Sequence, residues 1–225
     1  MFFTSNKNNS TSKPNILKYP KMNDAQMMNN KTNLLGLEII ELLSAYCEGF
    51  FPMADENNGE ISWYSPNYRA IFPIYHLKNP KSLYKFQNKN LMKCTIDNNF
   101  EKVIRACSQR KETWISEEII EMYCQLHITG FAHSIETWQD GKIVGGLYGV
   151  AIGGAFFGES MFNFASNASK VAFYYLVEHL KQRKFTLLDS QFINDFTAQL
   201  GAIEISREKY LKILDFSIKR KCSFL

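Results

Sequence analysis

The chain lacks the signals of a membrane or secreted protein. None of its 225 residues fall in a run of about 18 continuous apolar residues, the length that a membrane-spanning helix needs. The longest uncharged stretch, from Ile143 to Gly158, is interrupted by glycines at 145, 146, 149, 153 and 154. Residues 1–33 are rich in Asn, Lys and Ser and have no apolar signal core. We therefore expect a cytoplasmic protein with no membrane association.

Common cofactor and metal motifs are also missing. The number of cysteines is odd, five in all, with no CxxC pair and no histidine at zinc-ligand spacing, which predicts a reduced compartment and no metal. None of the four histidines accompanies a GxSxG or Cys-His signature of nucleophilic catalysis. The glycines match neither GxGxxG nor GxxxxGK[ST]. We expect no cofactor, no covalent catalysis and no nucleotide hydrolysis.

Acidic residues are absent from Arg69 to Lys93, although the whole chain carries a net charge of only +4. Aromatic side chains lie among the cations of this stretch, and such a mixture suits a nucleic-acid surface, because phosphates need neutralising and bases offer faces for stacking. A solvated lysine face is the equal alternative. The cations considered for tRNA binding are Arg69, Lys78, Lys81, Lys85 and Lys89.

The composition is that of a folded protein, with 45% hydrophobic and 14% aromatic residues, enough for an ample core. We expect residues 1–34 to be a polar, disordered extension and residues 219–225 to be a basic tail. Between them, residues 35–112 are predicted to form a small N-terminal α/β lobe, and residues 113–218 a larger C-terminal domain.

Hydrophobic periodicity predicts an α+β fold, with helices packed on a mainly antiparallel sheet. Ser116 is a good N-cap, and Asp140-Gly141 is a strong hairpin signal. Helices are expected at 35–48, 99–110, from 116 to about 130, at 167–181 and near 195–200. Strands are expected at 61–66, 71–74, 133–139, 142–152, 155–162 and 185–191, followed by a last strand and helix within 203–216.

A carboxylate and an amide stand two residues apart at the end of an apolar strand, at Asp189 and Gln191. Because side chains alternate across a strand, both are predicted to project from one face, with Ser190 on the other. Such a pair could orient and deprotonate an amine while the amide steadies a developing oxyanion. The alternative is that Asp189 caps the following loop.

Glu159 is predicted to share a strand face with Met161. It stands between glycine and apolar residues, where an unpaired carboxylate is expensive, so we expect it to have a partner. The functional interpretation is that Glu159 receives a cationic amino group or ribose hydroxyls. An internal salt bridge or backbone contact is equally consistent with the sequence.

Several segments together resemble the leucyl/phenylalanyl-tRNA-protein transferase family. The most specific are GGLYGV at 145–150 and FGESMF at 157–162. AYCEGFFP at 45–52, TWI at 113–115, NASK at 167–170, LDSQ at 188–191 and LGA at 200–202 follow in the family's order and spacing. The resemblance extends over most of the chain after about Leu35.

The resemblance implies transfer of leucine or phenylalanine, and less readily methionine, from aminoacyl-tRNA to the α-amine of proteins that begin with Lys or Arg. The product carries a degradation signal. It also implies that the C-terminal domain is GNAT-like. Separately, we expect the protein to be a monomer.

The resemblance assigns roles to individual residues. Asp189 polarises Gln191, which contacts the incoming amine, and Glu159 lies at the polar edge of the donor pocket. Trp63 and Trp114 stack on or cover the terminal adenosine. The pocket for the donor side chain is formed by Leu147, Phe156, Met161 and Leu176.

The chain departs from the family's usual pattern at Met53, where Trp is frequent, at Ser190, where Cys is usual, and at Phe196, where His is common. Two other functions are possible alternatives from the sequence. An acyl-CoA-dependent N-acetyltransferase needs a pyrophosphate-binding loop, which residues 162–168 do not supply. A noncatalytic tRNA-binding module is supported only by the lysine-rich stretch and leaves Asp189 and Gln191 without a purpose.

Overall fold

The computed structural model describes residues 31–54, 61–81, 83, 91–109 and 113–225, and the side chains from residue 39 onward within these ranges except Ala54. The first helix, α1 (Lys31–Cys47), begins four residues before its predicted start at residue 35, so residues 31–34 are helical. The rest of the predicted extension lies outside the described residues, as do Lys85 and Lys89.

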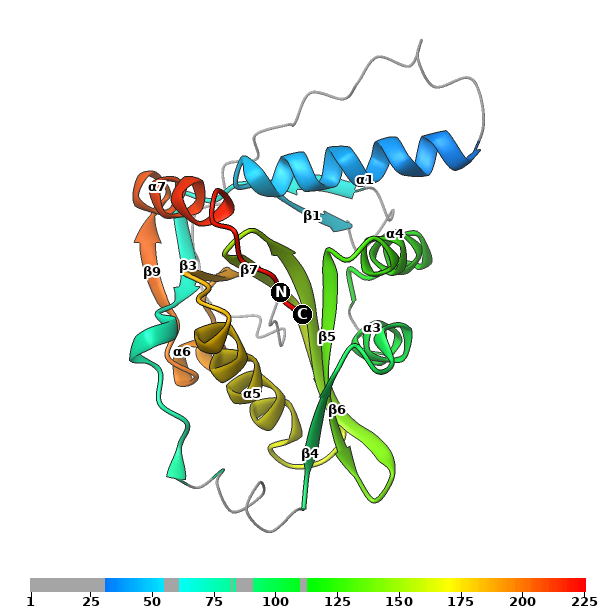
Figure 1. Ribbon diagram of the computed structural model, residues 1–225, viewed down its shortest axis with the longest axis vertical. Helices are drawn as coiled ribbons and strands as arrows, with labels where there is room; N and C mark the ends of the chain where they lie inside the picture. The colour runs from blue at the N-terminus through cyan, green and yellow to red at the C-terminus, as the bar shows by residue number, and fades with distance from the viewer. Residues whose placement is uncertain (1–30, 55–60, 82, 84–90, 110–112) are drawn as a thin grey trace.

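A seven-stranded mixed sheet forms the centre of the molecule (Figure 1). Only β7 and β8 are parallel; their neighbours pair antiparallel, and β1 (Phe51–Ala54) and β2 (Ile61–Tyr64) form a separate hairpin. The predicted meander of three strands is confirmed. Across the sheet, the order is β4 (Lys93–Ile96), β5 (Ala132–Gln139), β6 (Lys142–Ile152), β7 (Ala155–Asn163), β8 (Leu187–Gln191), β3 (Tyr68–Phe72) and β9 (Ile203–Ser206).

The predicted boundary near residue 112 does not separate two sheets. Strand β4 pairs with β5 at one edge, and β3 lies between β8 and β9. Strands from the predicted N-terminal lobe are therefore built into the sheet of the predicted C-terminal domain. Short apolar strands carry no sequence signal for their distant partners, so periodicity alone could not place them.

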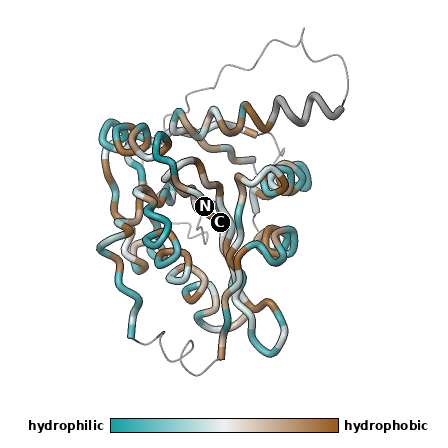
Figure 2. Tube along the Cα trace, in the orientation of Figure 1, coloured by the Kyte–Doolittle hydropathy of each residue, from teal (hydrophilic) through white to brown (hydrophobic). Residues whose placement is uncertain are grey.

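Helices cover both faces of this sheet. Figure 1 shows α3 (Phe100–Ser108) and α4 (Glu117–Ile128) on one side and α5 (Ala168–Gln182) on the other, with α1 and α7 (Arg207–Ile218) across the top of the view. The remaining short helices are η2 (Ile74–His76) and α6 (Asp195–Gln199). In Figure 2 hydrophobic stretches follow the strands between these layers, as burial of apolar surface requires.

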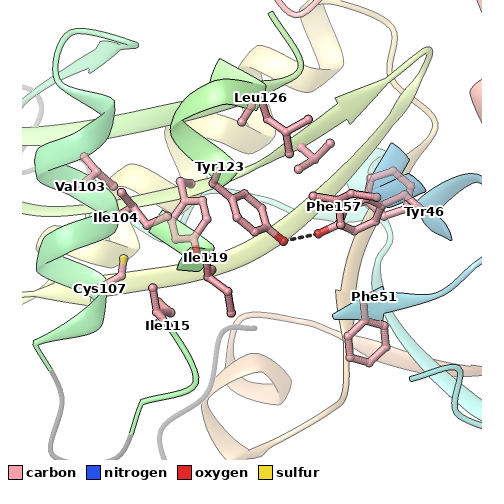
Figure 3. Close-up of a cluster of buried hydrophobic side chains, with 14 of the residues drawn as sticks. Tyr46, Phe51, Val103, Ile104, Cys107, Ile115, Ile119, Tyr123, Leu126 and Phe157 are labelled. Carbon is pink, nitrogen blue, oxygen red and sulfur yellow. Dashed lines mark hydrogen bonds between the residues drawn. The ribbon is translucent and has the colours of Figure 1, made fainter. Parts of the chain in front are cut away.

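The two faces bury separate apolar clusters. The first core, between the sheet and helices α1, α3, α4 and α7, includes Tyr46, Phe51, Tyr123 and Phe157 (Figure 3). The second core, under α5, includes Leu147, Phe156, Leu176, Phe185 and Phe224. Strand alternation explains the division, because neighbouring residues such as Phe156 and Phe157 enter opposite cores.

Local signals set the turns and caps as expected. Asp140 and Gly141 have φ values of 50° and 74°, the left-handed pair that a tight hairpin between β5 and β6 requires. Ser116 Oγ accepts the Ile119 N–H at 3.3 Å and caps α4. The predicted basic tail is packed rather than loose near its end, because Phe224 is 3% exposed and its carbonyl accepts a bond from His179 Nε2 at 2.6 Å.

Among the residues that the structure describes, no helix has both the length and the apolar character needed to cross a membrane.

Helix α5 approaches β6 closely at Gly145, where an added Cβ would lie 2.6 Å from Ala168 Cβ. We expect Gly145→Ala to lower the free energy of unfolding by about 1–3 kcal/mol, because the helix must shift to relieve the overlap. Denaturant unfolding measures the change. Lys142→Ala, at the exposed start of the same strand, is the control and should stay within about 0.5 kcal/mol. An unchanged midpoint for Gly145→Ala would contradict this packing.

Candidate active site

The pairing between strands β7 and β8 ends in the middle of the sheet. Their parallel pairing runs from Ala155↔Leu187 to Phe157↔Asp189 and ends there, although β7 continues to Asn163. Strand β8 then keeps only its other neighbour, with Gln191 opposite Ala70 of β3.

Several buried polar atoms that have no hydrogen-bond partner belong to residues that follow the last β7–β8 pair. Within the described residues, these atoms include the hydroxyls of Ser160 and Ser190 and both ends of the Gln191 carboxamide. All three residues are completely buried. An unsatisfied buried polar group is costly, and where several occur together they indicate a site prepared for another molecule. We therefore place the candidate site here.

Glu159 occupies a bulge in β7. Tyr148 of β6 is opposite Ser160, whereas the next residue, Gly149, is opposite Gly158, so Glu159 is the extra residue. The bulge breaks strand alternation. The prediction that Glu159 and Met161 share a face is therefore wrong: Glu159 contacts Tyr46 of the first core, and Met161 packs in the second core.

Two tyrosines connect Glu159 to helices α1 and α4. Tyr46 Oη donates to Glu159 Oε1 at 2.6 Å, and the hydroxyls of Tyr46 and Tyr123 lie 2.5 Å apart (Figure 3). Either hydroxyl of the tyrosine pair can be the donor of the bond between them. Burial raises the pKa of both phenols well above 10, so both stay protonated donors. The expected partner of Glu159 is thus a hydroxyl relay.

Asp189 is held by three residues on the same face of the sheet. Arg69 binds it with both Nε and Nη2, at 2.9 Å to Oδ1 and 2.6 Å to Oδ2. Tyr210 Oη donates to Oδ2 at 2.8 Å, and the Gln191 backbone N–H donates to Oδ1 at 2.9 Å. The carboxylate is fully buried and is bonded at both oxygens.

Arg69 is not the surface cation that the sequence suggested. Its side chain is 1% exposed, and its guanidinium lies 4.5 Å from the Phe51 ring centroid and 4.6 Å from that of Tyr210. Burial opposes its charge, but Asp189 outweighs this effect and raises the pKa of Arg69 overall. The guanidinium cannot reach tRNA phosphates, so the expectation of an Arg69 contact with tRNA is corrected to an internal ion pair.

Gln191 leaves the strand conformation, with φ of 60°. Alternation therefore does not extend to Gln191, and its link to Asp189 is made through its backbone N–H rather than through its carboxamide. The bond from the Gln191 N–H to Asp189 also agrees with the alternative interpretation, in which Asp189 caps the following loop. The carboxamide that was expected to be polarised by Asp189 is buried and makes no hydrogen bond to any described group.

The other predicted residues fall in three places. Those of the expected donor pocket lie together in the second core, on the opposite face of the sheet from Glu159. Trp63 and Trp114 are half-buried at the margin of the first core. Lys78 and Lys81 are exposed, and Lys85 and Lys89 lie outside the described residues. The pocket residues are Leu147, Phe156, Met161 and Leu176.

The described residues of this region form no metal cluster. In the described part of the chain, no three His, Cys, Asp or Glu side chains are grouped to hold a metal ion. A hollow of about 380 Å³ lies elsewhere, between α3 and Phe162 and Phe164 of the β7 end.

Tyr46, Tyr123, Tyr210 and Ser160 were not predicted as members of the site. Tyr46 lies in the segment 45–52 that supported the family resemblance, so a signal for it was present. The pairing of Arg69 with Asp189, which are 120 positions apart, leaves no mark in a single sequence.

Glu159 makes the stability depend on pH. Burial raises the pKa of its carboxyl above the ordinary value of 4.5, so the native chain keeps this proton at pH values where the unfolded chain has lost it. The free energy of unfolding therefore falls as pH rises above 4.5. We expect Glu159→Gln, which does not titrate, to gain melting temperature relative to the wild type between pH 4.5 and pH 8.

Thermal denaturation over this pH series tests the expectation. The same series on Glu204→Gln, an exposed carboxyl on β9, controls for the removal of one charge. A difference between Glu159→Gln and the wild type that does not change with pH would contradict the raised pKa.

Comparisons with known proteins identify the family of the chain. The profile of the leucyl/phenylalanyl-tRNA protein transferase family matches residues 71–215, and the profile of its N-terminal domain matches residues 37–67. Leucyl/phenylalanyl-tRNA–protein transferase of Chlorobaculum tepidum is 48% identical over 193 residues, 84% of this chain and 100% of that protein. The Gloeobacter violaceus protein of the same name is 48% identical over 183 residues, 81% of this chain and 95% of that one.

Among solved structures, L-PGS from Bacillus licheniformis aligns with a TM-score of 0.40 at 12% identity, over 71% of this chain and 55% of that one, too weak a likeness to bear on the fold. The sequence matches establish the family without this structural likeness. They cover both the β7–β8 region and the N-terminal elements that pack against it. The chain belongs to the leucyl/phenylalanyl-tRNA-protein transferase family.

Proposed function

We propose that the chain transfers leucine or phenylalanine, and less readily methionine, from aminoacyl-tRNA to the α-amine of proteins that begin with Lys or Arg, and so creates a degradation signal. The observation that supports this most is the Gln191 carboxamide, which is fully buried, has no partner and lies where β7 and β8 separate. Family membership supplies the class of reaction.

Because an aminoacyl ester is already reactive, the enzyme mainly has to align the α-amine with the ester carbonyl. The α-amine nitrogen attacks the ester carbonyl, an amide bond forms, and the tRNA ribose oxygen leaves with a proton. An N-terminal amine titrates at about 7.7–8.0, so a useful fraction is neutral near pH 7. Gln191 can accept an N–H of this amine with Oε1 and donate to the developing oxyanion with Nε2.

The donor side chain is proposed to enter the second core beside Leu147 and Met161, which are opposite each other in the β6–β7 register. Both lie beyond the last pair that β7 makes with β8. A Leu, Phe or Met side chain seated there would carry its ester toward the open edge of β8. Branching at Cβ would be excluded by shape. Phe156 and Leu176 complete the apolar lining.

Glu159 and the half-buried tryptophans are proposed to receive the polar parts of the substrates. Glu159 ends the relay from Tyr123 and Tyr46, which fixes its carboxyl for ribose hydroxyls or a cationic amine. Trp63 and Trp114 keep part of their surface exposed and can cover the terminal adenosine. Lys78 and Lys81, both exposed, are the described cations proposed to contact tRNA phosphates.

The succession of the β5–β7 meander, α5 and the parallel strand β8 supports a GNAT-like assignment, which in turn raises the N-acetyltransferase alternative. That alternative needs free backbone donors at the start of α5 for a pyrophosphate. The Ser169 N–H there is already bonded to Asn163 Oδ1 at 3.1 Å. Aminoacyl-tRNA is therefore the better donor.

A transfer assay tests the function directly. Purified protein with radiolabelled leucyl-tRNA should label a peptide that begins with Arg or Lys, and should not label the same peptide after N-terminal acetylation. Labelled acetyl-CoA in place of leucyl-tRNA is the control for the alternative. Transfer from acetyl-CoA and none from leucyl-tRNA would overturn the proposal.

Gln191 is the residue whose loss should affect the chemical step most. We expect Gln191→Ala to lower kcat by about 10²–10³-fold, the range for removal of one oxyanion donor, with little change in thermal stability. Gln199→Ala, at an exposed position of α6, is the matched control. A Gln191→Ala enzyme with wild-type kcat would remove the carboxamide from the mechanism.

A further inference from the structure

Asp189 has no free lone pair with which to take a proton. Oδ1 accepts from Arg69 Nε and from the Gln191 N–H, and Oδ2 accepts from Arg69 Nη2 and Tyr210 Oη. Arg69 Nε also lies 3.1 Å from Oδ2. A carboxylate oxygen offers about two acceptor sites, so these bonds fill both oxygens. The side chain is also completely shielded from solvent. Neither an amine nor a water molecule can reach this carboxylate without displacing one of its donors.

Contacts with two aromatic rings and a backbone carbonyl hold the Arg69 side chain in place. Its guanidinium is held against the Phe51 and Tyr210 rings, and its Nη1 donates to the Gly49 carbonyl at 3.2 Å. The planar fork then presents Nε and Nη2 side by side to Asp189, a geometry that a lysine ammonium cannot reproduce. Arg69 therefore determines where the two Asp189 oxygens lie.

The position of Oδ1 determines the backbone of Gln191. A non-glycine residue at φ of 60° is in a costly left-handed conformation, which persists only where neighbouring groups hold it. The bond from the Gln191 N–H to Asp189 Oδ1, at 2.9 Å, supplies that restraint. No described group bonds the carboxamide itself, so its direction depends on the backbone that Asp189 holds.

We infer that Arg69 is a positioning residue for the transfer reaction: it clamps Asp189 so that Asp189 holds the left-handed backbone of Gln191 and presents the Gln191 carboxamide to the reacting groups. In this arrangement Asp189 orients Gln191 and takes no proton during transfer. The role rests on the proposed function, because it assigns Gln191 to contact the amine and the ester.

Arg69→Lys tests the clamp while a cation remains opposite Asp189. We expect kcat for leucyl transfer to fall by about 10- to 100-fold, the effect of a small misplacement of a reacting group, with KM for leucyl-tRNA within about 2-fold of the wild type. The loss should be the same factor at every pH from 6 to 9, because no titrating catalytic group is removed. Arg207→Lys, whose arginine donates to Ser65 Oγ outside the site, should leave kcat unchanged.

A matched pair of double variants separates orientation from proton transfer. Arg69→Met with Asp189→Asn removes both charges but keeps an oxygen that can accept the Gln191 N–H. Arg69→Met with Asp189→Leu removes that acceptor too. If Asp189 orients Gln191, the Asn variant should retain at least about 10-fold more kcat than the Leu variant. If Asp189 takes a proton, both variants are equally inactive.

The outcomes distinguish this inference from the proposed function. Absence of leucyl transfer by the wild type would overturn the proposed function itself. An active wild type with an unchanged Arg69→Lys enzyme, or a rate loss that varies with pH, would overturn the positioning role. Circular dichroism establishes that each variant is folded, and Arg69→Lys alone decides the inference if the double variants do not fold.

Discussion

The buried ion pair between Arg69 and Asp189 connects the parts of the chain that make the site. Arg69 lies on β3 and Asp189 on β8, and the side chains that enclose the pair come from the β1 hairpin and from α7. Two charges removed from water are stable only when nearly all their donors and acceptors are used, as they are here. Loss of either partner would leave an uncompensated buried charge, at a cost of about 3–5 kcal/mol. Tight packing around the pair is therefore a condition for folding.

The second buried carboxyl group, that of Glu159, has different surroundings. Glu159 lies on the same face as Asp189, and its hydrogen-bond partner among the described residues is the neutral hydroxyl of Tyr46. Burial raises its pKa, and the negative charge of Asp189 adds to this effect. One acid is thus committed to a cation, while the other can exchange a proton or receive a polar substrate group. The β7 bulge produces this arrangement, because without the extra residue Glu159 would not project toward Tyr46.

Much of the fold could be predicted, because the meander, the Ser116 cap and the Asp140-Gly141 turn depend on local sequence. Asp189 and Gln191 were proposed as site residues from the same local pattern together with the family resemblance, and their roles stay predictions. The predicted side-chain faces were wrong where the backbone departs from regular strand alternation, at the Glu159 bulge and at the left-handed Gln191. The prediction that Arg69 contacts tRNA was also wrong. A cation in a stretch without acidic residues resembles a surface residue as long as its partner, Asp189, is not known.

The long separation of Arg69 and Asp189 has a consequence for biosynthesis. The two residues are 120 positions apart, so at roughly 5–20 residues per second the ribosome needs about 6–24 s to make Asp189 after Arg69. During that interval β3 has neither of its sheet neighbours, because β8 and β9 both follow later. A nascent or prematurely terminated chain thus carries an unpaired strand with an unneutralised arginine, and aminoacyl transfer can begin only after nearly the whole polypeptide has left the ribosome.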